Sequence, residues 1–228
     1  RDALDTVMTY KSETVLLIDT AGIRRSGKVE AGIERYSTLR SIRAIARADV
    51  AVLVIDASEL ATAQDTHIAS FILDAYKGIF IAVNKWDLSS RLNLNQEQAV
   101  SNIRGRFKFI PHAPICFISA LDRLGIDSFL DMAHEVHSQW TKAIPRYQLK
   151  RTVMNAVAEH PPSSSGRRSL KIYSVAQDQS GPPSFTFYVN HSDMVHFSYH
   201  RYLENTIRDA YGFSGAPLRM RFRGRGDR

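Results

Sequence analysis

The chain has 228 residues, which is enough for one large or two modest domains, each with a core of its own. Hydrophobic residues make up 44% of it and charged residues 23%, and no apolar run approaches the length of a bilayer, which excludes a chain built of membrane-spanning helices. The single cysteine, Cys116, cannot form an internal disulfide, and no charged segment followed by an apolar one opens the chain, so we expect a reducing, cytoplasmic setting and no membrane association.

In the first part of the chain, short β-rich runs alternate with helical patterns. This order predicts an α/β fold with a mostly parallel sheet and helices on both faces. The first two runs are separated by three residues and are expected to form an antiparallel hairpin. The expected strands cover residues 6–10, 14–18, 50–56, 79–83 and 115–118, and the expected helices lie around 39–46, 68–75, 96–107 and 126–140.

Pro145 closes this pattern, and a smaller α+β unit of order α-β-β-α-β is predicted after it. We therefore expect two domains, residues 1–145 and 146–228. The first carries 17 Lys/Arg and 17 Asp/Glu, and the second carries 13 against 6, so the whole net charge of +7 lies in the second domain. A basic domain of this kind favours a polyanionic partner, although a basic segment that only keeps the protein soluble is the plainer alternative. The elements expected here are a helix over 149–159, strands over 169–176 and 184–190, a helix over 199–211 and a strand over 218–222.

Three short motifs follow apolar strands in the first domain. Asp19-Thr20-Ala21-Gly22-Ile23 begins with D-x-x-G, in which an aspartate can hold Mg²⁺ through water and a glycine lets a backbone N–H approach a phosphate. Asn84-Lys85-Trp86-Asp87 reads N-K-x-D. A carboxylate at Asp87 would accept from both N1–H and the exocyclic amine of guanine, two adjacent donors that adenine lacks. Asn84 would tie this loop to its neighbours and reach the purine edge, while the Lys85 stem would cover the base plane.

The third motif, Ser119-Ala120-Leu121, follows the strand at 115–118, and the N–H of Ala120 would donate to guanine O6. Each motif alone also fits a plain structural interpretation, as a turn or a helix cap. Three of them in this order, each at the end of an apolar strand, predict a guanine-nucleotide site with GTP or GDP and Mg²⁺ as ligands.

Arginines alternate with apolar residues in the last predicted strand. This period of two predicts one apolar face and one arginine face, which favours contact with RNA. A solvated strand edge, protected from aggregation by its charge, is the alternative. Gly212-Phe213-Ser214-Gly215 spells G-x-x-G but joins a helix to this strand, so we interpret it as a helix cap and turn. The candidate RNA-binding residues are Arg219, Arg221, Arg223 and Arg225, with Lys171 and Arg201 in support.

The chain resembles the Der (EngA) double GTPases of ribosome biogenesis over nearly its whole length. The resemblance to their second GTPase domain rests on Arg1-Asp2-Ala3-Leu4-Asp5, Asp19-Thr20-Ala21-Gly22-Ile23-Arg24-Arg25, Gly27-Lys28-Val29, Glu34-Arg35-Tyr36-Ser37 and Asn84-Lys85-Trp86-Asp87-Leu88. His196-Phe197-Ser198-Tyr199 and Arg201-Tyr202-Leu203-Glu204-Asn205 resemble their C-terminal KH-like domain. This implies GTP hydrolysis coupled to binding of the large (50S) ribosomal subunit, with the KH-like domain on ribosomal RNA and a further GTPase domain upstream.

The sequence contains no G-x-x-x-x-G-K-[ST] phosphate loop. By the resemblance, that loop and the first, central strand would precede residue 1, so we expect the stretch alone to be inactive and its flanking strands to lack partners. No catalytic residue is assigned, because Ile23 occupies the place of the water-orienting glutamine of Ras-like enzymes, and the resemblance implies help from K⁺ instead. The alternatives are an Era-like GTPase that binds small-subunit RNA, which the displaced G-x-x-G disfavours, and a nucleotide-independent RNA-binding scaffold.

Overall fold

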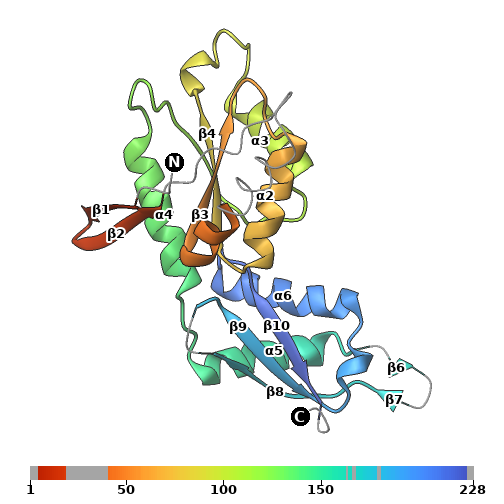
Figure 1. Ribbon diagram of the computed structural model, residues 1–228. Coiled ribbons are helices and arrows are strands. Elements are labelled where there is room, and N and C mark those ends of the chain that lie inside the picture. Colours follow the sequence, from red (N-terminus) through yellow and green to blue (C-terminus); the bar gives the residue numbers. More distant parts are fainter. Residues whose placement is uncertain (1–4, 19–40, 163, 166–167, 179–180, 225–228) are drawn as a thin grey trace. The chain divides into compact units, whose positions relative to one another are not determined.

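The computed structural model (Figure 1) describes residues 5–18, 41–162, 164–165, 168–178 and 181–224. The chain divides into two compact units, Arg1–His137 and Ser138–Arg228, each with its own hydrophobic core. Among the described helices, none is long and apolar enough to cross a membrane.

A three-stranded parallel sheet organises the first unit. Its order is β3 (Val50–Asp56), β4 (Gly78–Asn84) and β5 (Ile115–Phe117), with Val50 opposite Gly78 and Ile81 opposite Ile115. The central strand is buried from Gly78 to Val83, as expected for an apolar strand covered on both faces. The predicted parallel sheet is thus confirmed.

Helices cover both faces of this sheet (Figure 1). On one face, Ile72 and Ile103 from two helices pack against strand residues that include Ile81. On the other face, Val136 packs against Phe80, so the side chains of neighbouring strand residues enter opposite cores. The flanking helices are α2 (Ala63–Asp74) and α3 (Gln96–Arg106) on the first face and α4 (Ile126–Trp140) on the second.

The predicted hairpin is confirmed as a separate antiparallel pair, β1 (Asp5–Tyr10) and β2 (Glu13–Ile18). Its two-residue turn has positive φ at both Lys11 and Ser12, the geometry of a tight hairpin turn. The hairpin and the three-stranded sheet share no strand pairing among the described residues. Apolar side chains are exposed on both, among them Leu16 (47%) and Val54 (53%).

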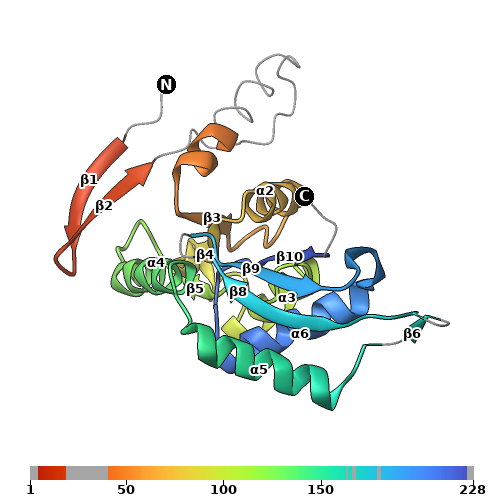
Figure 2. The same ribbon diagram turned by 90° about the horizontal axis from the view of Figure 1, so that it is seen from below.

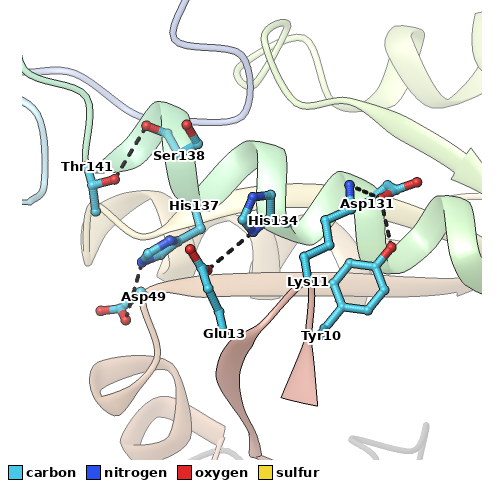
Figure 3. Close-up of polar contacts among 9 residues, drawn as sticks. All are labelled: Tyr10, Lys11, Glu13, Asp49, Asp131, His134, His137, Ser138 and Thr141. Carbon is cyan, nitrogen blue, oxygen red and sulfur yellow. Dashed lines mark hydrogen bonds and ion pairs between the residues drawn. The ribbon is translucent and has the colours of Figure 1, made fainter. Parts of the chain in front are cut away.

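Polar contacts join the hairpin to α4 (Figure 3). Asp131 accepts a hydrogen bond from the Tyr10 hydroxyl at 2.7 Å and pairs with the Lys11 ammonium at 2.5 Å, while Glu13 lies 3.4 Å from His134. The hydrogen bonds from Lys11 and then Tyr10 lower the pKa of Asp131. These groups are largely exposed, and exposed pairs of this kind stabilise a fold only weakly.

The second unit has the predicted order of α-β-β-α-β. Its sheet has the order β10 (Arg219–Arg223), β9 (Ser184–Val189) and β8 (Ile172–Gln177), with β10 parallel and β8 antiparallel to β9. Helices α5 (Arg146–Glu159) and α6 (Phe197–Tyr211) lie on one face of this sheet (Figure 2). Val153 and Leu203, one from each helix, belong to the same core as Phe187. A two-stranded ladder, β6 (Ser164–Ser165) and β7 (Arg168–Ser169), was not predicted. Short 3₁₀ turns lie at Trp86–Leu88 and Ser192–Met194.

The interpretation of the G-x-x-G segment as a cap and turn is confirmed. Helix α6 ends at Tyr211, and Gly212 follows with a φ of 86° while its N–H donates to the carbonyl of Arg208 at 2.7 Å. The next residue, Phe213, turns into the core and is fully buried. This segment therefore joins the helix to the last strand and fills the core beneath it.

Candidate functional site

Loops from all three parallel strands meet at the carboxyl edge of the sheet. Asp56 ends β3 and pairs in register with Asn84, which ends β4, and Ser119 follows shortly after β5. Because the strands are parallel, their C-terminal ends lie at the same edge, where open α/β sheets bind ligands. Two of the three predicted motifs are thereby brought together.

One side-chain and one backbone hydrogen bond join the second loop, which follows β4, to the third loop, which follows β5. The Asn84 carboxamide oxygen accepts from the N–H of Ala120 at 3.0 Å, and the N–H of Trp86 donates to the carbonyl of Ile118 at 3.0 Å. The Trp86 ring also packs against Phe117, with centroids 4.3 Å apart. The Ala120 N–H, which the sequence assigns to guanine O6, is thus engaged by Asn84, and a base would have to share or replace that bond. Leu121 is 84% exposed.

The Asp87 carboxylate is oriented by a buried serine. The Ser119 hydroxyl, in a residue that is only 1% exposed, donates to Oδ1 of Asp87 at 2.7 Å. An ionised carboxylate has about four acceptor positions, so this one bond leaves it able to accept two further donors side by side. A carboxylate fixed in this way suits a ligand with two adjacent N–H groups.

Lys85 has a left-handed backbone, with φ 63° and ψ 35°, which is uncommon for a residue other than glycine. Its ammonium lies 2.5 Å from Oδ2 of Asp56, whose other oxygen accepts from the N–H and the hydroxyl of Ser58. Burial alone would raise the pKa of Asp56, but Lys85 and Ser58 outweigh it and lower that pKa. Asp56 was missed by the sequence interpretation; its signal is an acidic residue at the C-terminal end of an apolar strand.

A glycine turn closes the third loop. Ser119 and Leu124 exchange backbone hydrogen bonds of 3.0 Å, and Gly125 follows with a φ of 73°. A Cβ at Gly125 would lie 2.5 Å from the carbonyl oxygen of Phe117. Only glycine fits this close approach, so it helps to fix the position of Ser119.

The D-x-x-G motif, Asp19-Thr20-Ala21-Gly22-Ile23, lies outside the described residues, and with it the predicted Mg²⁺ ligand Asp19. Within the described ranges, no cluster of three His, Cys, Asp or Glu side chains has the arrangement of a metal site.

The predicted RNA-binding residues lie on two sides of the second unit. Arg219, Arg221 and Arg223 are on β10 and Lys171 immediately precedes β8, whereas Arg225 is outside the described residues. Arg201 lies on α6 instead, with its guanidinium 5.8 Å from the centre of the Phe197 ring. It belongs to a helix that packs on the opposite face of the sheet from the exposed β10 arginines.

Phe222, which the sequence interleaves with these arginines, faces the core. It stacks on Phe187, with centroids 4.9 Å apart and planes 20° apart. Any aromatic contact with RNA on the arginine face must therefore come from other residues.

Two family models match the sequence. Residues 3–139 match the Elongation factor Tu GTP binding domain, and residues 143–223 match the KH-domain-like region found at the C-terminus of EngA bacterial GTPase enzymes. The two matches cover almost the whole chain without overlap.

Curated relatives named GTPase Der are similar to this chain over nearly its whole length. Identity is 46% over 226 residues to the protein from Chloroflexus aggregans and 41% over 229 residues to that from Syntrophotalea carbinolica. These alignments cover 99% and 100% of this chain but 50% and 52% of the relatives, so the chain spans about half their length.

Among solved structures, Aquifex aeolicus Era bound to GDP·AlF₄⁻ is similar with a TM-score of 0.51 and 16% identity, over 97% of this chain and 80% of that one. Era in complex with MgGDPNP and nucleotides 1506–1542 of 16S ribosomal RNA aligns with the same TM-score at 15% identity. At such identities the likeness concerns the fold alone.

Proposed function

Because this chain belongs to the Der (EngA) family of GTPases, we propose that it supplies the guanine-recognising half of a GTPase domain together with an RNA-binding domain. We assign residues 1–145 to the first and 146–228 to the second, with Pro145 at the start of α5 as the boundary. In the intact protein the two would couple GTP binding and hydrolysis to assembly of the large ribosomal subunit in the cytoplasm.

The joined loops at the carboxyl edge of the sheet carry this proposal. Asp87, oriented by the Ser119 hydroxyl at 2.7 Å, would accept from guanine N1–H and the exocyclic amine. Lys85, held against Asp56, would lay its stem along the base. Asn84 would keep the two base-binding loops in register through its bond to Ala120. Adenine offers no matching pair of donors, so this set of contacts favours guanine nucleotides.

Phosphate handling would fall to Asp19 and Gly22, with Mg²⁺ supplying charge neutralisation at the phosphates. The aliphatic Ile23 cannot orient water, and the resemblance to the Der family implies that hydrolysis by the intact enzyme relies on K⁺ instead. Replacing K⁺ with Na⁺ in a GTP hydrolysis assay tests this dependence. The rate should fall, and an unchanged rate would exclude a role for K⁺. Without a phosphate loop, the 228-residue chain alone is expected to bind GTP weakly.

The deciding experiment replaces Asp87 in the intact protein. Asp87→Asn exchanges one acceptor oxygen for an N–H₂, so it should weaken GDP binding by roughly ten- to a hundredfold. It should also strengthen binding of xanthosine diphosphate, whose base presents a carbonyl where guanine has its amine. Titration of fluorescent nucleotides measures both.

Asp74→Asn, an exposed acid at the end of α2, is the matched control and should bind GDP as the wild type does. If Asp87→Asn leaves both affinities unchanged, the loops do not read the base. In that case a nucleotide-independent RNA-binding scaffold becomes the better assignment.

A further inference from the structure

The sheet of the second unit has one face under the helices and one outside them. On β9, Phe185, Phe187 and Val189 are at most 1% exposed and belong to the core, whereas Tyr188 between them is 42% exposed. On β10, Met220 and Phe222 pack on the core, while Arg221 and Arg223 are exposed. Alternate residues of a strand point to opposite faces, so Tyr188, Arg221 and Arg223 share the outer face.

A β-bulge adds a second tyrosine to this outer face. Ile172 pairs with Val189 and Ser174 pairs with Tyr188, which leaves Tyr173 as an extra residue between them. Strict alternation after Ile172 would send Ser174 inward and Val175 outward. The bulge lets Val175 return to the core at 0% exposure while Tyr173 stays outside at 43%.

Positively charged residues lie beside these tyrosines on the same sheet. Arg223 lies directly opposite Tyr188 on the neighbouring parallel strand, and Arg221 lies opposite Thr186 two residues earlier. Lys171 enters the same end of the sheet, where the Asn190 carboxamide accepts its N–H at 2.8 Å. Arg221 pairs with Asp178 at 3.9 Å, an exposed pair that is weak in water. The face thus combines exposed aromatic rings with a surplus of positive charge.

We propose that this face, consisting of Tyr173, Tyr188, Arg221 and Arg223, is a stacking platform for unpaired nucleotides of RNA. Bases stack on the two tyrosine rings, and the arginines neutralise the adjoining phosphates. A duplex hides its base faces within its own stack and presents phosphates, 2′-hydroxyls and base edges, none of which stacks on a ring, so exposed rings favour single-stranded RNA. The inference rests on the RNA-binding role proposed above and specifies which RNA, and which residues, that role involves.

The test measures binding of a fluorescein-labelled oligouridine, and of the same strand annealed to its complement, by fluorescence anisotropy with the intact protein. Tyr173→Ala and Tyr188→Ala should each weaken binding of the single strand by roughly five- to a hundredfold and leave the duplex little changed. Tyr188→Phe keeps the ring and should bind within about twofold of wild type. Arg223→Gln should reduce the slope of log affinity against log salt by about one.

Tyr147→Ala is the matched control, because Tyr147 is a more exposed tyrosine (73%) with an arginine, Arg151, 5.6 Å away on α5. It should bind the single strand as the wild type does. If Tyr173→Ala and Tyr188→Ala both bind the single strand as tightly as the wild type does, the stacking platform is wrong but RNA binding by the domain stands. If the wild type binds neither strand, the proposed RNA function fails with it.

A third result is also informative. Tyr147→Ala could weaken single-strand binding as much as Tyr188→Ala does. Exposed tyrosines would then contribute whether or not they lie on the outer face of the sheet. That result would overturn the platform as well.

Discussion

Two residues with left-handed backbones, Lys85 and Gly125, shape the loops that we propose to bind the base. Lys85 is left-handed, which lets its side chain turn back toward Asp56 while Asp87 turns toward Ser119. Gly125 is also left-handed and allows the third loop to fold against the carbonyl of Phe117. Non-glycine residues in such conformations cost on the order of 1 kcal/mol and persist only where the surroundings hold them. Here the contacts with Asp56 and Ile118 hold the second loop in place.

Gly125→Ala should destabilise the first unit by roughly 1–3 kcal/mol, because a Cβ would meet the Phe117 oxygen at 2.5 Å and φ is 73°. It should also weaken guanine-nucleotide binding by the intact protein, since Ser119 would shift. Urea denaturation and nucleotide titration measure the two effects. Gly105→Ala is the control: nothing lies within 4 Å of its Cβ, and the helix α3 around it should gain about 0.5–1 kcal/mol. Equal stability of the two variants would contradict the steric argument.

The sequence could predict that Asp87 and Ser119 approach each other, because parallel strands bring their C-terminal ends to one edge. It also predicted that Asn84 ties its loop to its neighbours, but it did not identify the partner, the backbone N–H of Ala120, which lies 36 residues away. Nor did it single out Asp56, since one acidic residue after a strand has no motif around it. Contacts between loops depend on side-chain rotamers, which the pattern of residues does not specify.

At the scale of elements, residue period was a reliable guide to strands and helices. The alternation in β10 predicted its two faces, and the 3.6-residue pattern predicted α4 over its full observed range. The two-residue strands β6 and β7 have no period to detect. The same alternation placed Phe222 on the apolar face, but it did not identify the core residue on which the ring stacks, Phe187.

Phe222→Ala and Arg221→Ala separate the two faces of β10. Phe222→Ala removes the stack on Phe187 and should lower the free energy of unfolding of the second unit by about 2–4 kcal/mol. Arg221→Ala should change it by no more than about 0.5 kcal/mol, because its pair with Asp178 is exposed, yet it should weaken RNA binding. Chemical denaturation and anisotropy with the same oligouridine provide the comparison. Loss of stability in Arg221→Ala as large as that in Phe222→Ala would refute the assignment of faces.

At the scale of the whole molecule, the chain consists of two units with separate cores. One core is centred on β4 and its flanking helices, and the other lies between the second sheet and its two helices. The charge asymmetry and the change of pattern near Pro145 predicted two domains with a boundary there, whereas the two compact units divide between His137 and Ser138. Each unit also contains one of the two tryptophans, Trp86 beside Phe117 and Trp140 against Gly181.

Single-tryptophan variants should therefore report the unfolding of each unit separately. In Trp86→Phe, fluorescence follows the second unit through Trp140, and in Trp140→Phe it follows the first through Trp86. Adding Phe222→Ala should shift the midpoint in the Trp86→Phe background and leave that in Trp140→Phe unchanged. Coincident midpoints that move together would show instead that the two cores unfold cooperatively.

The bulge in β8 makes the outer face of the second sheet sensitive to insertions and deletions during evolution. One inserted residue reverses the inside–outside phase of the strand, so Ile172 and Val175 both reach the core although they are three residues apart. Deleting a single residue there would restore strict alternation, and the strand would lose either an inward apolar side chain or the outward Tyr173. A tyrosine that aligns with Tyr173 in a related chain therefore lies on the outer face only if that chain has the same number of residues in this strand. At this position a one-residue gap changes the chemistry of the surface more than most substitutions do.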